Sequence, residues 1–168
     1  MNERFTCSRC NEIHPGPPLA YSSVAPGAWY QLTDEQRAAS RLDGELCFIE
    51  GVRFFVRANV EIPVSDASTE LVYAAWVELE AEDMGRLVER WDASDRSTDP
   101  GYVGTLANDL AGYPETIGLK TEVQTREPGM RSRAVLAPAE HRLAVDVWEG
   151  ITMSRVQEVA EMLAHPLR

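Results

Sequence analysis

Hydrophobic residues occupy every second position from Val52 to Ile62, and most of the intervening side chains are polar. A period of two predicts a β-strand that buries one face. The apolar run 46–49 comes just before it, across Glu50-Gly51, so the two segments predict a hairpin. Further strands are predicted over residues 71–79, 119–126 and 131–137, and the turn sequence at 127–129 joins the last two into a second hairpin.

Other segments repeat their apolar residues at helical spacing. Apolar side chains between Met84 and Trp91 fall on one stripe, which predicts a helix. Thr33 and Gln36 form a capping-box pattern that predicts a short helix, and a last helix is predicted over residues 154–164. The strands come in hairpins with helices at intervals, rather than as strand–helix–strand crossovers. We therefore expect an α+β fold, with an antiparallel sheet built from hairpins and helices packed on it.

The chain has 168 residues, a length typical of one domain, so we expect residues 1–168 to form a single domain. Residues 1–28 contain two cysteines and a histidine, followed by a stretch rich in proline and glycine. Proline fixes its own φ and keeps its neighbour out of the helical region, so this stretch should be an extended arm. Residues 29–168 should form the α+β body.

The formal net charge is −11 and the isoelectric point is about 4.7. Nucleic-acid binding depends on lysine and arginine contacts to phosphates, so this charge argues against a nucleic-acid partner. The acidic surplus favours a basic protein partner, or it serves solubility alone. No apolar run reaches the roughly 18–20 residues that a membrane span needs, and the first residues do not resemble a signal peptide. We therefore expect a cytoplasmic protein that does not enter a membrane.

Cys7, Cys10 and His14 form the clearest chemical motif in the chain. Two thiolates separated by two residues, with an imidazole shortly after them, are ligands that zinc prefers. A closed structural zinc site needs four protein ligands, and Cys47 is the chemically preferred fourth. The spacing alone leaves plain reduced cysteines and redox cycling as alternatives. The other candidates for the fourth ligand are His141, His165, Asp43 and Glu45.

Several short motifs occur along the chain in a characteristic order. They are Cys7-x-x-Cys10 with His14-Pro15, Glu45-x-Cys47-x-Ile49, Glu61-Ile62-Pro63-Val64, Trp76-Val77-x-Leu79, Tyr113-Pro114, His141-x-Leu143-Ala144 and Gly150-Ile151-Thr152. With these motifs the chain resembles the prokaryotic family known as domain of unknown function 2199. The resemblance implies no reaction, since that family has no assigned activity. Asn11 stands where the family usually has a glycine, and asparagine tolerates a positive φ better than most residues.

The sequence contains neither a Gly-x-Ser-x-Gly nucleophile motif nor a phosphate-binding Gly-x-x-x-x-Gly-Lys motif. The leading hypothesis is a binding or interaction module that is stabilised by a structural zinc ion and has an acidic surface. The alternative is an enzyme of unrecognised type, with a pocket near His141 and the strand face that carries Arg57 and Glu61. Whether the chain is an enzyme stays open at this point.

Overall fold

The computed structural model describes residues 4–166. Its α-helices are α1 (Asp34–Ala38), α2 (Ala81–Glu89), α3 (Arg142–Glu149) and α4 (Met153–Ala164), and its 3-10 helices are η1 (Gly27–Gln31) and η2 (Arg96–Thr98). The strands are β1 (Phe5–Thr6), β2 (Ile13–His14), β3 (Ala20–Ser22), β4 (Arg41–Leu42), β5 (Leu46–Ile49), β6 (Arg53–Val64), β7 (Thr69–Leu79), β8 (Tyr102–Leu106), β9 (Lys120–Gln124) and β10 (Arg133–Leu136). The α+β prediction is confirmed at this level.

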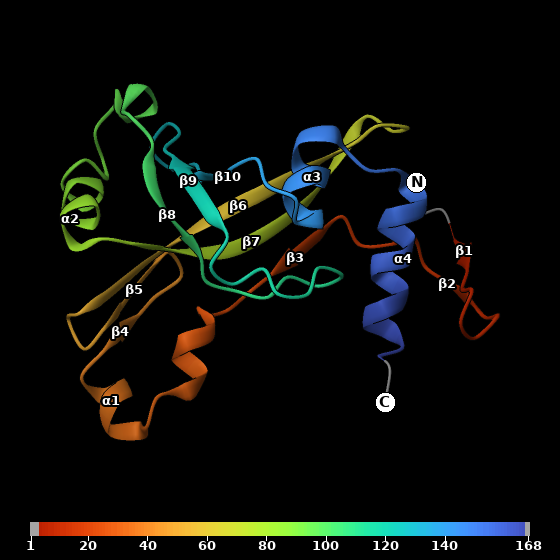
Figure 1. The fold of residues 1–168 in the computed structure, drawn as a ribbon, viewed down its shortest axis with the longest axis horizontal. Helices are drawn as coiled ribbons and strands as arrows, with labels where there is room; N and C mark the ends of the chain where they lie inside the picture. The colour runs from red at the N-terminus through yellow and green to blue at the C-terminus, as the bar shows by residue number, and fades with distance from the viewer. Residues whose placement is uncertain (1–3, 167–168) are drawn as a thin grey trace.

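The long hairpin of β6 and β7 forms the centre of the molecule (Figure 1). Strands β8, β9 and β10 continue from β7 in antiparallel order, and β10 then pairs with β6 in parallel at Arg133 and Asn59. This last pairing closes the five strands β6 to β10 into a barrel. Strand β3 adds to β7 in parallel, while β5 and β4 extend from β6.

The sheet differs from the one expected from the sequence. The two expected hairpins form as β5–β6 and β9–β10. Five of its strands close into a barrel and the sheet includes two parallel pairings, so it is not a simple antiparallel sheet. Strand β8 and helix α3 had no counterpart among the predicted elements. Strand β8 lies in a segment whose glycine and proline content is typical of loops.

The alternating residues of β6 and β7 fill the barrel interior. Val56, Val60, Leu71 and Val77 are fully buried there, and Leu143 of α3 packs against the same core. The outer face of this hairpin carries a second apolar cluster, which η1 covers. Its buried members are Cys47, Ile49, Phe55, Trp76 and Ala107. The pattern of period two had placed Phe55 on the polar face, but η1 makes that face a second buried layer.

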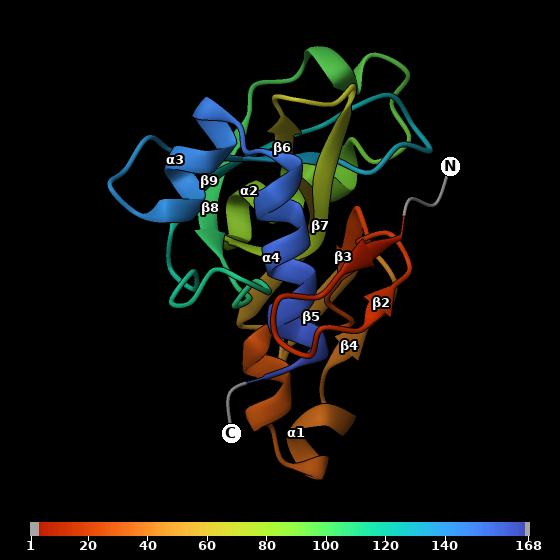
Figure 2. The same cartoon turned by 90° about the vertical axis from the view of Figure 1, so that its right-hand side faces the viewer.

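Helix α4 and the hairpin of β1 and β2 lie side by side at one end of the molecule (Figure 2). Thr152 caps the helix through its hydroxyl, which accepts the backbone N–H of Arg155. Segments from both ends of the chain therefore meet at one place. Within the part that the structure describes, none of the helices has the length and apolar character needed to cross a membrane.

Candidate metal centre

A tight turn between β1 and β2 carries Cys7 and Cys10, and His14 lies on β2 directly after it. The backbone N–H of Cys7 donates to the Glu12 carbonyl at 2.9 Å, and the N–H of Asn11 donates to the Cys7 carbonyl at 3.0 Å. Asn11 has a φ of 59°, in the left-handed region that asparagine tolerates. The N–H of Arg9 also points at the Cys7 sulfur, at 3.4 Å. We call the segment from Phe5 to His14 the knuckle.

The turn brings Cys7, Cys10 and His14 together with His165, which follows α4. One ligand atom from each of the four residues lies within 4.8 Å of all the others. Cys10 Sγ and His14 Nε2 are 3.2 Å apart, and sulfur and nitrogen ligands of a tetrahedral zinc ion lie about 3.5 Å apart. The four residues therefore form a Cys₂His₂ set that fits a small tetrahedral cation after minor side-chain adjustment.

His165 provides an independent indication of a ligand. Its Nε2 is buried and has no hydrogen-bond partner within residues 4–166. A buried polar atom without a partner is unfavourable, and a cation bound by this nitrogen would remove that cost. The rings of His14 and His165 meet edge to face, with their centroids 5.6 Å apart. Both imidazoles thus belong to the same small cluster.

The surroundings of Cys10 favour the neutral form of its thiol. A backbone hydrogen bond from Glu12 lowers the pKa of the Cys10 thiol, but burial and the neighbouring Cys7 sulfur outweigh it and leave that pKa raised. Cys7 is 1% exposed. A cation would take the place of the thiol protons, since zinc is bound by thiolates.

Contacts outside the ligand set fix the knuckle on α4. The backbone N–H of Ser8 donates to the Glu161 carboxylate at 2.9 Å, and the Ser8 hydroxyl donates to its other oxygen. These bonds, with one from Gln157, lower the pKa of Glu161 to about 2. The Arg9 guanidinium donates to the main-chain carbonyl of His165 at 2.6 Å. His165 is therefore held close to the turn by protein contacts alone.

A comparison with known families agrees with the order of motifs in the sequence. The model of a family described as an uncharacterized protein conserved in bacteria (DUF2199) matches residues 6–151. The chain belongs to this family. The DUF2199 match includes the three ligands of the knuckle and ends before α4, so His165 lies beyond it. No curated protein and no solved structure matches the chain.

Cys47, our first choice for the fourth ligand, is in a different part of the molecule. It is fully buried in β5 within the cluster that η1 covers, together with Phe55 and Trp76. Burial, with a smaller effect of the nearby Asp43 carboxylate, raises the pKa of its thiol to about 11. Its ligand atom does not join the four-residue group, so His165 replaces Cys47 in the candidate set.

The remaining candidates for the fourth ligand are engaged elsewhere. His141 is the N-cap of α3: its Nδ1 accepts the Leu143 N–H at 3.0 Å, and its Nε2 lies 2.9 Å from the Pro114 carbonyl. Asp43 accepts the N–H groups of Glu45 and Leu46 and pairs with Arg41. The Glu45 carboxylate pairs with Arg131 at 2.6 Å.

The side chains of the alternative enzymatic site, near His141 and on the strand face with Arg57 and Glu61, are also engaged in other contacts. Both ring nitrogens of His141 are in contact with main-chain groups, which leaves no free general base there. The Arg57 guanidinium donates to Ser22 and to the Gly44 carbonyl, and Glu61 pairs with two arginines of the neighbouring segments. Within residues 4–166 these side chains have structural roles, and nothing in their arrangement favours catalysis.

Proposed function

We propose that the chain is a binding module of the cytoplasm, stabilised by one structural zinc ion and directed at a basic protein partner. The observation that carries the metal assignment is the convergence of ligand atoms from four residues, one of which, His165, has a buried Nε2 without a hydrogen-bond partner among residues 4–166. Four protein ligands complete the coordination of zinc and leave no position for a catalytic water. A structural role follows from that closed set.

Zinc at this site would join the two ends of the fold. Cys7, Cys10 and His14 come from the knuckle, whereas His165 ends α4. The hydrogen bonds from Ser8 to Glu161 and from Arg9 to the His165 carbonyl already hold the knuckle against α4 and His165, so the cation would bind a preformed site. Structural zinc contributes about 10–16 kcal/mol in small zinc-finger peptides, enough to lock this end of the molecule.

The distribution of charge supports a basic partner. Within residues 4–166, ten arginines are neutralised in ion pairs, for example Arg53 with Glu78 and Arg90 with Asp99. Many exposed acids are outside every ion pair among residues 4–166. Those on and beside α2 are Glu80, Glu82, Glu89 and Asp92. The net charge of −11 is thus presented to solvent largely as free carboxylates, which attract a basic surface.

Elemental analysis of the purified protein tests the metal. We expect about one zinc per chain in the wild type and in Cys47→Ser, and little zinc in the double variant Cys7→Ser/Cys10→Ser. Cys47→Ser is the matched control, because it also removes a buried thiol. Zinc-free wild-type protein after purification and reconstitution with zinc would contradict the proposal.

Charge reversal tests the partner. Glu82 and Glu89 are seven residues apart on α2 and therefore share a face. We expect Glu82→Lys/Glu89→Lys to abolish cross-linking to basic proteins of a bacterial lysate. Glu140→Lys/Glu149→Lys, which makes the same change of net charge at the two ends of α3, should preserve it. Equal cross-linking by both double variants would refute a partner site on α2.

A further inference from the structure

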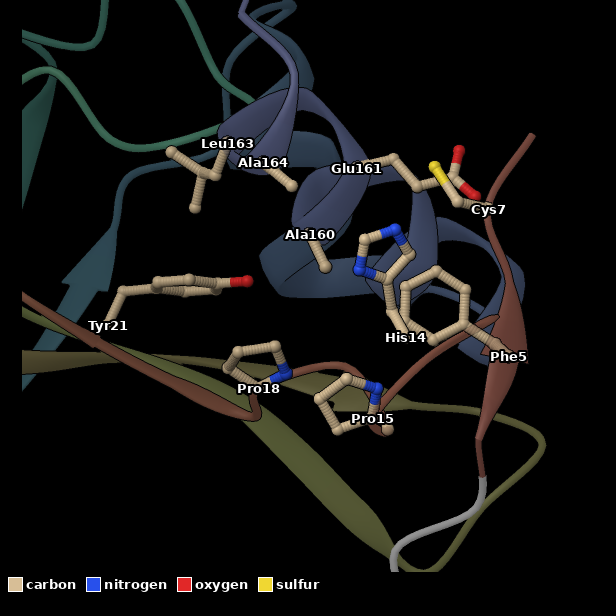
Figure 3. Close-up of a pocket in the computed structure, with 11 residues that line it drawn as sticks. Phe5, Cys7, His14, Pro15, Pro18, Tyr21, Ala160, Glu161, Leu163 and Ala164 are labelled. Carbon is tan, nitrogen blue, oxygen red and sulfur yellow. The ribbon is translucent and has the colours of Figure 1, made fainter. Parts of the chain in front are cut away.

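A cavity of about 230 Å³ lies between the knuckle, the proline-rich arm and α4. Its walls are mostly apolar, as the close-up in Figure 3 shows. The apolar lining comes from Phe5, Pro15, Pro18, Ala160, Leu163 and Ala164. An apolar cavity of about 150 Å³ can hold a benzene molecule, so this one has room for a ring with a small substituent.

Tyr21 provides the polar feature of this cavity. Figure 3 shows its hydroxyl pointing across the space toward α4. The hydroxyl oxygen is buried and has no hydrogen-bond partner within residues 4–166. Burial raises the pKa of Tyr21, so the hydroxyl keeps its proton at neutral pH and can donate a hydrogen bond to a ligand. A buried hydroxyl without a partner is unfavourable, and a ligand oxygen would satisfy it.

The position of this hydroxyl is fixed by the sheet. Tyr21 lies on β3 opposite Tyr73 of β7, and the two rings stack with their centroids 5.4 Å apart. The Tyr73 hydroxyl is itself occupied, because it donates to the Ala111 carbonyl at 2.7 Å. Tyr21 therefore presents one oriented donor from a rigid support.

The other polar residues of the cavity wall have partners of their own. The Glu161 carboxylate accepts hydrogen bonds from Ser8 and Gln157, and Cys7 and His14 belong to the candidate metal cluster. A water molecule needs two to four polar partners, and this lining offers few. The negative charge of Glu161 also disfavours an anion.

We infer that this cavity binds a small, uncharged aromatic molecule of about the size of phenol, whose single oxygen accepts a hydrogen bond from Tyr21. This activity goes beyond the proposed zinc-stabilised module, because the ligand touches the knuckle and α4 without needing contact with the cation. A test on protein of known zinc content therefore separates the two proposals.

Phenol and toluene are matched probes, since a hydroxyl in one replaces a methyl group in the other. We expect saturable chemical-shift changes of residues 160–164 in a ¹⁵N–¹H NMR titration of the full chain with phenol. Tyr21→Phe keeps the ring and should weaken phenol binding about fivefold to tenfold, the loss expected for one hydrogen bond, while toluene binding changes less than about twofold. Tyr30→Phe, at an exposed tyrosine outside the cavity, should leave both affinities unchanged.

Filling the cavity provides the second test. Ala160→Leu should abolish binding of both probes, and Ala164→Phe, at a more exposed position of the same wall, serves if the first variant does not fold. Benzoate should not bind, because of the charge on Glu161. The inference is overturned if phenol gives no saturable shifts up to its solubility limit, if Tyr21→Phe binds phenol as tightly as the wild type, if both filled variants still bind it, or if benzoate binds as tightly as phenol.

Discussion

Replacing His165 by alanine separates the ligand set of the structure from the one that the sequence favoured. The substitution removes the ligand that follows α4 and leaves the three ligands of the knuckle in place. It also keeps the main-chain carbonyl that accepts the Arg9 hydrogen bond at 2.6 Å, so the knuckle should stay docked. The change therefore reports on metal coordination rather than on folding.

The expected magnitude follows from the closed set of four ligands. If the roughly 10–16 kcal/mol of structural zinc is shared evenly, each ligand contributes about 2.5–4 kcal/mol. This corresponds to about 100- to 1000-fold in Kd. Competition with a chromophoric chelator, in reducing buffer at neutral pH, measures that ratio.

Cys47→Ala is the matched control for this prediction. Cys47 is 0% exposed in the core beneath η1, so its loss should lower the free energy of unfolding without changing the zinc Kd. Circular dichroism verifies that both variants are folded. A His165→Ala protein that binds zinc as tightly as the wild type, or a Cys47→Ala protein that loses zinc, would refute the assignment.

Three further predictions concern the fold and the thiols. Tyr113→Phe removes the 2.8 Å hydrogen bond to the buried Asp146 carboxylate, so urea denaturation should show a loss of about 2 kcal/mol; an unchanged midpoint would contradict this role. Gly104→Ala would put a Cβ 2.0 Å from the Glu78 carbonyl oxygen of β7, so the free energy of unfolding should fall by about 3 kcal/mol in the same assay. An unchanged free energy of unfolding would mean that β8 does not approach β7 so closely. Cys47 is buried and the pKa of its thiol is raised to about 11, so it should not react with iodoacetamide at pH values below that pKa until the chain unfolds. The half-buried Cys10 of chelator-treated protein should react first. Mass spectrometry of the alkylated peptides measures this order, and the opposite order would mean that Cys47 is accessible.

Sequence patterns predict those helices and strands whose formation depends mainly on residues close together in the chain. The alternation along β6 is visible because one face of that strand fills the barrel. The capping box at Thr33 and Gln36 is present in α1 because it needs only residues of one turn. Strand β8 was not predicted, because its formation depends on a contact between segments that are distant in the sequence. Its Gly104 is required by the close approach of β7, a contact between distant segments, and in the sequence a glycine favours a loop.

The same distinction applies to the candidate site. The spacing of Cys7, Cys10 and His14 indicates three ligands because one turn brings them together. His165 comes from the other end of the chain, and only the packing of α4 on the knuckle places it there. Cys47 lies within a run of apolar residues, and such a cysteine behaves as a small buried hydrophobe. Ligand chemistry alone gave it too much weight.

X-ray absorption spectroscopy at the zinc edge, on the zinc-loaded full chain, measures the coordination directly. The proposed zinc centre predicts one zinc per chain with two sulfur neighbours at about 2.3 Å and two nitrogen neighbours at about 2.0 Å. A spectrum with three sulfur neighbours, or a chain that retains no stoichiometric zinc, would contradict a centre made of Cys7, Cys10, His14 and His165.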